Sequence, residues 1–417
     1  MRISGNYHIA EALARKIDSL DKNDLHFLFD SGFLYAALMS KADDDQLKEE
    51  YLNKGISAVS KINKWMAKYN LSQSIPAGYI SLGYLASFMN SEAGVLKNFL
   101  NQVNEVIVNN SLQLIKYYWG NNENLKVEYY DVLHGATAMG RYLLKAEESE
   151  AYQVPISEIL NYLIYLTQGK ELKCVKNNFY ISPHNIGPFK NINDFPNGFI
   201  DLGMAHGTAG VLSFLGIALR EGIEVENQRQ AIKNLIEIYK KLVVKDGGKI
   251  KWPQYIAVDD RGSISPKYGS KASWCYGSLG INRALYIASK ATCDQDGEKL
   301  ALDSMMALCK LDISELGFHC PSFCHGFSGA KYIADLFYRD TGIQIFKNFS
   351  DKVHTEILSH YNQDHMYLFK KYDDNSETKE IIIKDSLSII DGATSIMCSL
   401  LLSGEENSFI SNMFMID

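Results

Sequence analysis

The chain has 417 residues, of which 46% are hydrophobic and 22% charged, and this is the composition of a folded globular protein rather than a disordered one. A formal net charge of −7 gives no support to nucleic-acid binding, which requires a basic surface. No apolar run approaches the roughly 18 residues that a membrane-spanning helix needs. These numbers indicate a globular protein that neither binds nucleic acid nor spans a membrane.

The N-terminus and the cysteines both indicate a protein that stays inside the cell. Residues 1–5 lack a charged region followed by an apolar core, so no secretion signal is expected. Without export, the seven cysteines are expected as reduced thiols, and their odd number and irregular spacing also argue against a disulfide framework. We expect a cytoplasmic protein whose cysteines fill the core unless another feature singles them out.

Most of the sequence follows the periodicity of helices with one polar face. In residues 9–20, Leu13 and Ile17 fall on one face, and residues 95–108 and 228–243 repeat the pattern. These helices alternate with stretches that are apolar nearly all round, such as residues 210–219. The alternation predicts two concentric layers, in which half-exposed helices cover buried ones.

A glycine begins each stretch that we expect as a buried helix. Glycine permits a tight turn and a close approach of two backbones at this position. The seven glycines are Gly32, Gly78, Gly135, Gly207, Gly277, Gly326 and Gly392. Successive glycines are 46 (Gly32 to Gly78) to 72 residues (Gly135 to Gly207) apart, which is the length of a helical hairpin. The repeat predicts an all-α fold, an α/α toroid of seven helical hairpins, with an open solenoid as the alternative.

Two stretches, residues 168–200 and 245–272, interrupt the helical pattern. The first is rich in proline and asparagine, and the second has two adjacent glycines followed by the alternating run Tyr255-Ile256-Ala257-Val258. We expect the two stretches to pair as a small β-containing extension on the surface. Neither has the character of an interdomain linker, so residues 1–417 are expected to form a single domain.

The repeat aligns chemically active residues just before the glycines. Cys275 and Cys324 both lie two residues before the glycine of their repeat. The position directly before the glycine holds His134, His206, Tyr276 and His325. Because equivalent positions of neighbouring hairpins lie at one end of the repeat, we expect Cys275, Cys324 and His325 to converge.

Two thiolates and one imidazole suit Zn²⁺, which prefers tetrahedral sites with sulfur and nitrogen ligands. Three protein ligands leave a fourth position for water or substrate, which is typical of a catalytic rather than a structural zinc site. His319 and Cys320 are competing ligands, and on spacing alone the cysteines could equally be core residues. The remaining cysteines lack this register and are expected to be structural; they are Cys174, Cys293, Cys309 and Cys398.

Three segments resemble the signature motifs of the lanthipeptide synthetase C family, the lanthionine cyclases. They are Gly203-Met204-Ala205-His206-Gly207, Trp274-Cys275-Tyr276-Gly277 and Cys324-His325-Gly326. The resemblance extends over essentially the whole chain, in order, and includes the sevenfold glycine pattern. The fold of the family is an α/α toroid, which agrees with the fold that the repeat predicts.

The resemblance implies a role for each matching residue. Cys275, Cys324 and His325 match the zinc ligands of the family, so Zn²⁺ is the implied cofactor. His206 matches an acid/base histidine, and Asp131 matches an aspartate placed near that histidine.

Two further positions are implied to act in catalysis. Tyr276 matches a tyrosine beside the metal, and Lys271 stands four residues before Cys275, where the family often has arginine. Lysine keeps the positive charge of arginine but loses its bidentate fork. Lys271, which we expect to stabilise an enolate charge, is therefore the departure from the family pattern.

Simpler roles stay open for these residues on residue type alone. Asp131 could be a helix N-cap, His206 a histidine bonded to backbone, and Tyr276 a packing residue. His134 matches no role in the family, and we expect it to be structural.

The implied activity is the formation of thioether rings in a lantibiotic peptide. A peptide cysteine, deprotonated at Zn²⁺, adds to a dehydroalanine or dehydrobutyrine of the same peptide and gives lanthionine or methyllanthionine. The implied partners are a dehydrated precursor peptide with its leader, a separate dehydratase and an export transporter. A complex with such partners could also hold the cytoplasmic protein at a membrane.

Other classes of function are weighed against this one. One is zinc-dependent addition or alkylation of another thiol, with glutathione or a prenyl group as the partner. Another is a non-catalytic scaffold of a modification complex, against which the intact set of two cysteines and one histidine argues. A glycosidase ranks last, because it would need paired carboxylates, and only Asp131 and Asp391 fall near the expected rim.

Overall fold

The computed structural model describes the chain except for residues 1, 70, 148, 169–177, 188–191, 260–262, 375–379 and 406–407. The chain divides into two compact units. Unit 1 consists of Met1–Val103 and Gly317–Ile410, and unit 2 consists of Asn104–Leu316 and Ser411–Asp417.

Half-exposed helices alternate along the chain with helices that are buried nearly all round, as the hydrophobic periodicity predicts. The half-exposed helices are α1 (Arg2–Asp18), α3 (Asp45–Met66), α5 (Lys97–Gly120), α7 (Gln153–Thr167), α9 (Gln228–Leu242), α11 (Gln295–Cys309) and α13 (Gln344–Ser359). The buried helices are α2 (Leu25–Lys41), α4 (Tyr79–Ala93), α6 (Ala136–Lys145), α8 (Thr208–Arg220), α10 (Ser278–Thr292), α12 (Phe327–Thr341) and α14 (Ala393–Leu402). A short helix, α15 (Phe409–Met413), follows. In α8, every residue except Arg220 is buried. Among the described residues, no helix is both long and apolar enough to cross a membrane.

Six of the seven predicted glycines stand directly before a buried helix, as its N-cap. They are Gly78, Gly135, Gly207, Gly277, Gly326 and Gly392. The prediction for Gly32 was wrong: Asp24 caps α2 by accepting a hydrogen bond from the backbone N of Phe27, so Gly32 lies inside the helix. A Cβ at Gly32 would lie 2.8 Å from Cδ2 of Leu85. This glycine therefore permits the close approach of α2 to α4.

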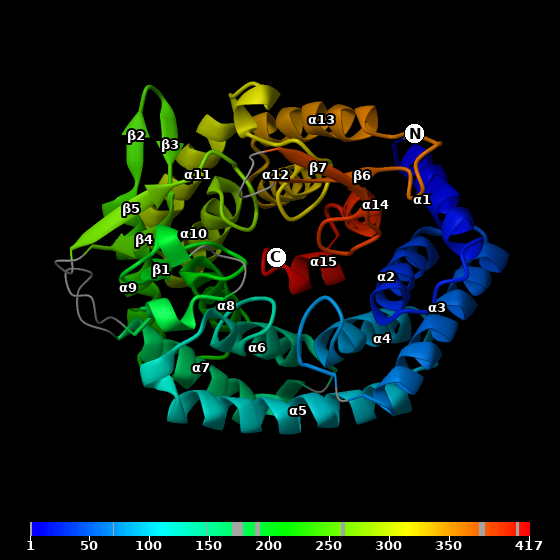
Figure 1. The fold of residues 1–417 in the computed structure, drawn as a ribbon, viewed down its shortest axis with the longest axis horizontal. Coiled ribbons are helices and arrows are strands. Elements are labelled where there is room, and N and C mark those ends of the chain that lie inside the picture. Colours follow the sequence, from blue (N-terminus) through cyan, green and yellow to red (C-terminus); the bar gives the residue numbers. More distant parts are fainter. Residues whose placement is uncertain are drawn as a thin grey trace. The chain divides into compact units, whose positions relative to one another are not determined.

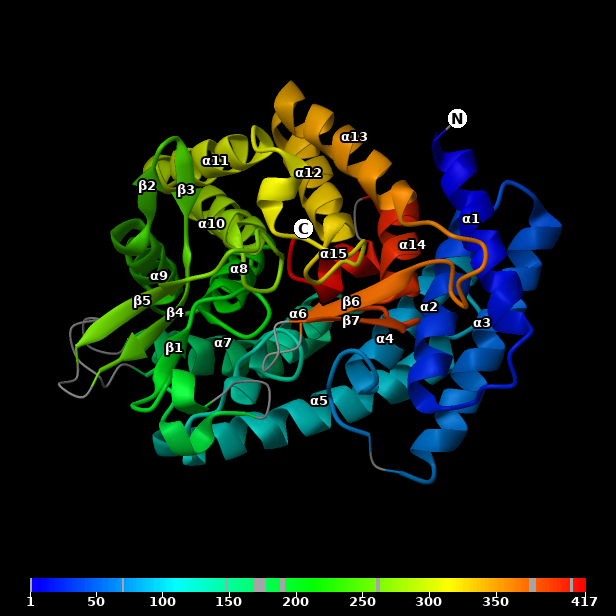
Figure 2. The ribbon, with the colours of Figure 1, turned by 45° about the horizontal axis from the view of Figure 1, so that its top comes forward.

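In unit 1, the buried helices pack against each other and against their half-exposed neighbours. Helix α2 contacts α1, α3, α4 and α14, and α12 contacts α13 and α14 (Figure 1). Strands β6 (Lys370–Asp374) and β7 (Ile381–Asp385) form an antiparallel hairpin, which Figure 2 shows in orange beside α14. Oδ1 of Asp30 in α2 accepts a hydrogen bond from the backbone N of Ile389 at 2.8 Å, which ties α2 to the turn before α14.

In unit 2, the same pattern is combined with short strands. Helix α8 contacts α6, α9 and α10, and α10 contacts α9 and α11. Strands β1 (Phe199–Asp201), β4 (Pro253–Val258) and β5 (Ile264–Tyr268) form one antiparallel sheet in this order. Strands β2 (Val244–Asp246) and β3 (Lys249–Lys251) form a separate hairpin.

The two non-helical stretches meet in this sheet, because β1 at the end of the first stretch pairs with β4 of the second. Ile256 and Val258 of β4 are buried, so the sheet packs into unit 2 along part of its length. Residues 169–177 and 188–191 of the first stretch, with Cys174, lie outside the described residues.

The C-terminal segment of unit 2 is hydrogen-bonded to two of its buried helices and to the turn before α10. The indole N of Trp274, in the turn before α10, donates to the backbone O of Phe414 at 2.9 Å. The Arg283 side chain in α10 donates to the backbone O of Ile416 at 2.6 Å, and the Ser213 hydroxyl in α8 donates to that of Met415 at 2.7 Å. The segment thus fixes the turn that carries Cys275.

Candidate metal centre and acid/base cluster

Backbone hydrogen bonds link the turns that precede the buried helices. In unit 2, the backbone N of Val132 donates to the O of Ala205 at 3.0 Å, and the N of Ala205 donates to the O of Cys275 at 3.2 Å. In unit 1, the N of Cys324 donates to the O of Ile390 at 3.1 Å. Every acceptor lies two residues before the glycine of its turn. Residues at the same position of the repeat in the sequence therefore also make the same backbone contact in the structure.

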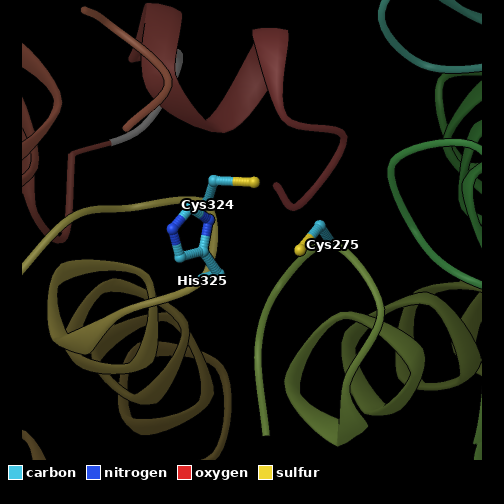
Figure 3. A group of neighbouring side chains, drawn as sticks. All are labelled: Cys275, Cys324 and His325. Atoms are coloured by element: carbon cyan, nitrogen blue, oxygen red, sulfur yellow. The ribbon is translucent and has the colours of Figure 1, made fainter. Parts of the chain in front are cut away.

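The structure brings the side chains of Cys275, Cys324 and His325 together. Their two thiol sulfurs and the nearest imidazole nitrogen all lie within 4.8 Å of one another (Figure 3). Cys275 is buried, and the other two are half-buried. Two sulfur donors and one nitrogen donor form a set that fits Zn²⁺, and they leave the metal a further coordination position. This group is able to hold a metal ion.

The turn that carries Cys275 is shaped by two neighbouring residues in unit 2. The Ser273 hydroxyl accepts hydrogen bonds from Sγ of Cys275 at 3.5 Å and from the backbone N of Tyr276 at 3.3 Å. Gly203 packs against the same turn, because a Cβ there would lie 2.6 Å from the backbone O of Cys275 and from Cδ1 of Tyr276. Only glycine allows the turn that carries His206 to come this close.

The competing ligands are not among the three clustered donors. His319 is exposed, and Cys320 is buried and hydrogen-bonds the Ser322 hydroxyl at 3.1 Å. Burial raises the pKa of the Cys320 thiol, but a hydrogen bond from the His325 side chain lowers it, and the net shift is downward. Cys320 therefore contacts His325 and is not one of the three clustered donors.

The remaining described cysteines lie elsewhere, as the sequence predicts. Cys293 is exposed at the end of α10, and Cys309 is half-buried at the end of α11. Cys398 is buried in α14, with its thiol 3.7 Å from the backbone O of Phe33. None of the three belongs to the group of clustered donors.

A second cluster lies within unit 2, around the carboxylate of Asp131. One oxygen, Oδ1, accepts hydrogen bonds from the backbone N of His134 at 2.6 Å and of Gly135 at 2.8 Å. The other oxygen, Oδ2, lies 2.6 Å from Nδ1 of His206 and 3.1 Å from Nδ1 of His134. Asp131 therefore caps its own turn and also holds two imidazoles.

The electrostatics of this cluster follow from its geometry. Burial alone would raise the pKa of Asp131, but the hydrogen bonds and charges of His134 and His206 outweigh it and hold that pKa below its usual range. Burial likewise lowers the pKa of His134, but Asp131 outweighs it and raises that pKa. Asp131 is thus ionised, and an ionised carboxylate can only accept hydrogen bonds.

The contact of His134 with Asp131 is the part of the site that the sequence analysis missed. His134 was expected to be structural because it matches no role in the family. The signal that could have identified it is its register, because it precedes Gly135 as His206 precedes Gly207.

Tyr276 and Lys271 lie on the same side of unit 2 as Cys275. The ring of Tyr276 lies 6.0 Å from that of His206 and 5.2 Å from that of Tyr255, measured between centroids. Burial raises the pKa of Tyr276, which also hydrogen-bonds Tyr255. Tyr276 and Lys271 both line a cavity of about 270 Å³.

The family of the chain follows from comparison with known sequences. The profile of the family described as "Lanthionine synthetase C-like protein" matches residues 31–415. The chain belongs to this family. Membership confirms the resemblance of the three motifs.

Two relatives of this lanthionine synthetase C-like chain are informative. The nisin biosynthesis protein NisC of Lactococcus lactis subsp. lactis is 25% identical over 358 residues, which cover 83% of this chain and 79% of NisC. A solved structure of nisin cyclase superimposes with a TM-score of 0.75 at 22% identity, covering 92% of this chain and 89% of that one. The likeness confirms the predicted fold class, the α/α toroid.

Proposed function

We propose that this lanthionine synthetase C-like protein is a zinc-dependent cyclase that forms lanthionine and methyllanthionine rings in a dehydrated precursor peptide. The observation that carries the proposal is the group of Cys275, Cys324 and His325, whose donor atoms lie within 4.8 Å of one another. NisC, a nisin biosynthesis protein, is a relative by sequence, so a leader-bearing lantibiotic precursor is the proposed substrate. A separate dehydratase must supply the dehydrated residues, and a transporter is the expected export partner.

Cys275, Cys324 and His325 would hold the metal. Bound Zn²⁺ supplies a Lewis acid that favours the thiolate form of a cysteine bound at its open position. The free thiol has a pKa of about 8.5 and is largely protonated near neutral pH, so its deprotonation is a necessary part of the reaction.

The chemistry of the ring requires a nucleophile and an acid. The substrate thiolate forms a bond from sulfur to the β-carbon of the dehydrated residue, and the electron pair of the double bond moves onto the α-carbon and its carbonyl as an enolate. A proton must then reach the α-carbon. We assign this proton to Nε2 of His206, whose Nδ1 is held by Asp131 at 2.6 Å.

The other two predicted residues support the same step. We assign to Lys271 the role of offsetting the negative charge of the enolate, and Tyr276 packs within 6.0 Å of the His206 ring, measured between ring centroids. The backbone contact between Ala205 and Cys275 fixes the acid relative to the thiol-binding turn. These contacts support a single site that combines thiol binding with proton transfer.

The test combines the purified protein with a dehydrated precursor peptide and counts the thiols that remain open to alkylation by mass spectrometry. Wild type should consume the peptide thiols and contain about one zinc ion per chain. Cys324→Ala should lose both properties, whereas Cys309→Ala should keep them, because Cys309 lies at the end of α11 outside the group. Equal ring formation by wild type and Cys324→Ala would rule out catalysis at the metal group, equal ring formation without the protein would show that it is not the catalyst, and thioethers formed only with added glutathione would assign another thiol substrate.

A further inference from the structure

The carboxylate of Asp131 is shared by two histidines, although the proposed reaction has so far used one. Nδ1 of His206 and Nδ1 of His134 lie 2.6 Å and 3.1 Å from the same oxygen, Oδ2. The imidazole rings are nearly parallel, with 11° between their planes and 6.2 Å between their centroids. His134 is the more accessible, with 37% of its side chain exposed against 21% for His206.

This arrangement fixes which nitrogen of each ring can react. An ionised carboxylate has no proton to give, so both Nδ1 atoms must be N–H donors to Oδ2. In a neutral imidazole with a proton on Nδ1, the other nitrogen, Nε2, carries the lone pair. Both Nε2 atoms therefore point away from Asp131 and can accept or donate a proton.

The same contacts limit the pair to one added proton. A single negative charge on Asp131 stabilises one imidazolium, and a second imidazolium about 6 Å away would be opposed by the first. With one added proton on the pair, the ring that carries it can act as an acid, and the neutral ring can act as a base.

We propose that His134 is a second catalytic residue of the cyclase, the base that receives the proton of the substrate thiol while His206 protonates the α-carbon. The inference rests on the proposed function. Its proton balance closes without a further reactant. As the sulfur–carbon bond forms, the S–H proton passes to Nε2 of His134 while Nε2–H of His206 supplies the new C–H bond, so the pair carries one added proton before and after the step. The proton gained by His134 then returns to His206 through solvent.

The surroundings of His134 are consistent with a base. The charged and titratable groups that act on His134 and its partners are Glu128 of the 3₁₀ turn Val127–Tyr129, Asp131, His206, Tyr118 of α5, Tyr130 and Tyr276. Burial raises the pKa of each of these three tyrosines, so they stay neutral near pH 7. The two carboxylates that act on His134, Asp131 and Glu128, both raise its pKa and make it a stronger base than an ordinary histidine.

The test is the pH dependence of kcat for ring formation by the zinc-loaded protein. Wild type should show a bell-shaped profile, since the base must be neutral and the acid protonated. His134→Gln should lower the maximum at least about tenfold and remove the acidic limb, while zinc content and melting temperature are unchanged. His8→Gln is the control, because His8 is 76% exposed on α1.

If His134→Gln has the same kcat and the same pH profile as His8→Gln, the inference is overturned and the proposed function stays intact. If the wild type forms no rings, the proposed function is overturned. Loss of one metal ion per chain in His134→Gln would instead assign Asp131, His134 and His206 as metal ligands. If the variant does not fold, ¹⁵N spectra of the histidines of wild type decide. Two Nδ1–H groups with stepwise titration of the Nε2 atoms support the proposal, and Nε2–H on both neutral rings overturns it.

Discussion

Two buried aspartates, one in each unit, occupy related positions and have opposite charge states. Asp30 of unit 1 accepts a hydrogen bond from Ile389 in the turn before α14, and Asp131 of unit 2 accepts from His134 and Gly135 in the turn before α6. Both side chains thus satisfy backbone N–H groups at the start of a buried helix. In both units the carboxyl group serves the architecture.

The difference lies in the charges around each carboxyl group. Burial raises the pKa of Asp30 to about 8, the hydrogen bond from Ile389 opposes this shift, and the negative charges of Asp391 and Asp24 add to it. Asp131 is equally buried, but two imidazoles hold its pKa below the usual range. Burial beside like charges therefore leaves Asp30 a protonated structural acid, whereas the two histidines beside Asp131 keep a buried carboxyl group ionised, so that it can orient their imidazole rings.

The largest effect is expected from removing the charge of Asp131 while keeping its turn. Ser273 occupies the equivalent position before α10, and its hydroxyl accepts from the backbone N of Tyr276. Asp131→Ser should therefore preserve the turn and cost about 1 kcal/mol of unfolding free energy. Because both histidines lose their partner, ring formation should fall about 100-fold or more.

Single-turnover kinetics and urea unfolding of Asp131→Ser measure the two effects separately. A variant that is strongly destabilised but cyclises normally once folded would contradict this expectation. Asp131 would then have only a structural role, as Asp30 has.

The Asp30 side of the comparison can be tested through the stability of the protein. In the unfolded chain an aspartate releases its proton near pH 3.9, but in the folded protein Asp30 keeps its proton up to about pH 8. Between these values the folded state binds one proton more, so Asp30 makes the wild type less stable as pH rises. The slope contributed by this group is at most about 1.4 kcal/mol per pH unit.

Asp30→Asn removes the titrating group and retains an oxygen that can accept from Ile389. Urea unfolding between pH 5 and 8 should show a gain in stability of the variant over wild type that grows with pH. Parallel curves over this range would mean that Asp30 is ionised in the folded protein, and the contrast with Asp131 would be lost.

The sequence predicts the fold through its repeat, because buried glycine turns recur and leave a visible period. The period fails at Gly32, because Asp24 caps α2 and the helix begins at Leu25, before this glycine. Gly32 is instead required because Leu85 of α4 packs against it, and such a contact between two helices leaves no pattern in the local sequence.

From the spacing alone, the site could be predicted only for residues that share a repeat position in the sequence and also meet in the structure. Cys275, Cys324 and His325 are aligned by the repeat and meet in the structure. The pairing of Asp131 with His206 spans 75 residues, and the resemblance to the family, not the spacing, suggested it. The contact of His134 with Asp131 could not be predicted, because it depends on which oxygen of Asp131 faces the imidazole, and the other oxygen is occupied by the capping bonds.

The smallest effect is expected at Lys271, where the chain departs from its family. Lys271 lines the cavity of about 270 Å³ beside Tyr276, so the cavity can accept a longer side chain. If the charge offsets the enolate, Lys271→Gln should lower kcat about tenfold, whereas Lys271→Arg should stay within about threefold of wild type. Steady-state kinetics that separate kcat from KM make the distinction, because loss of enolate stabilisation lowers kcat, and loss of peptide binding raises KM alone. Equal kcat values for wild type, Lys271→Arg and Lys271→Gln would remove Lys271 from the chemistry and leave proton transfer at the Asp131 cluster as the contribution of unit 2 to this step.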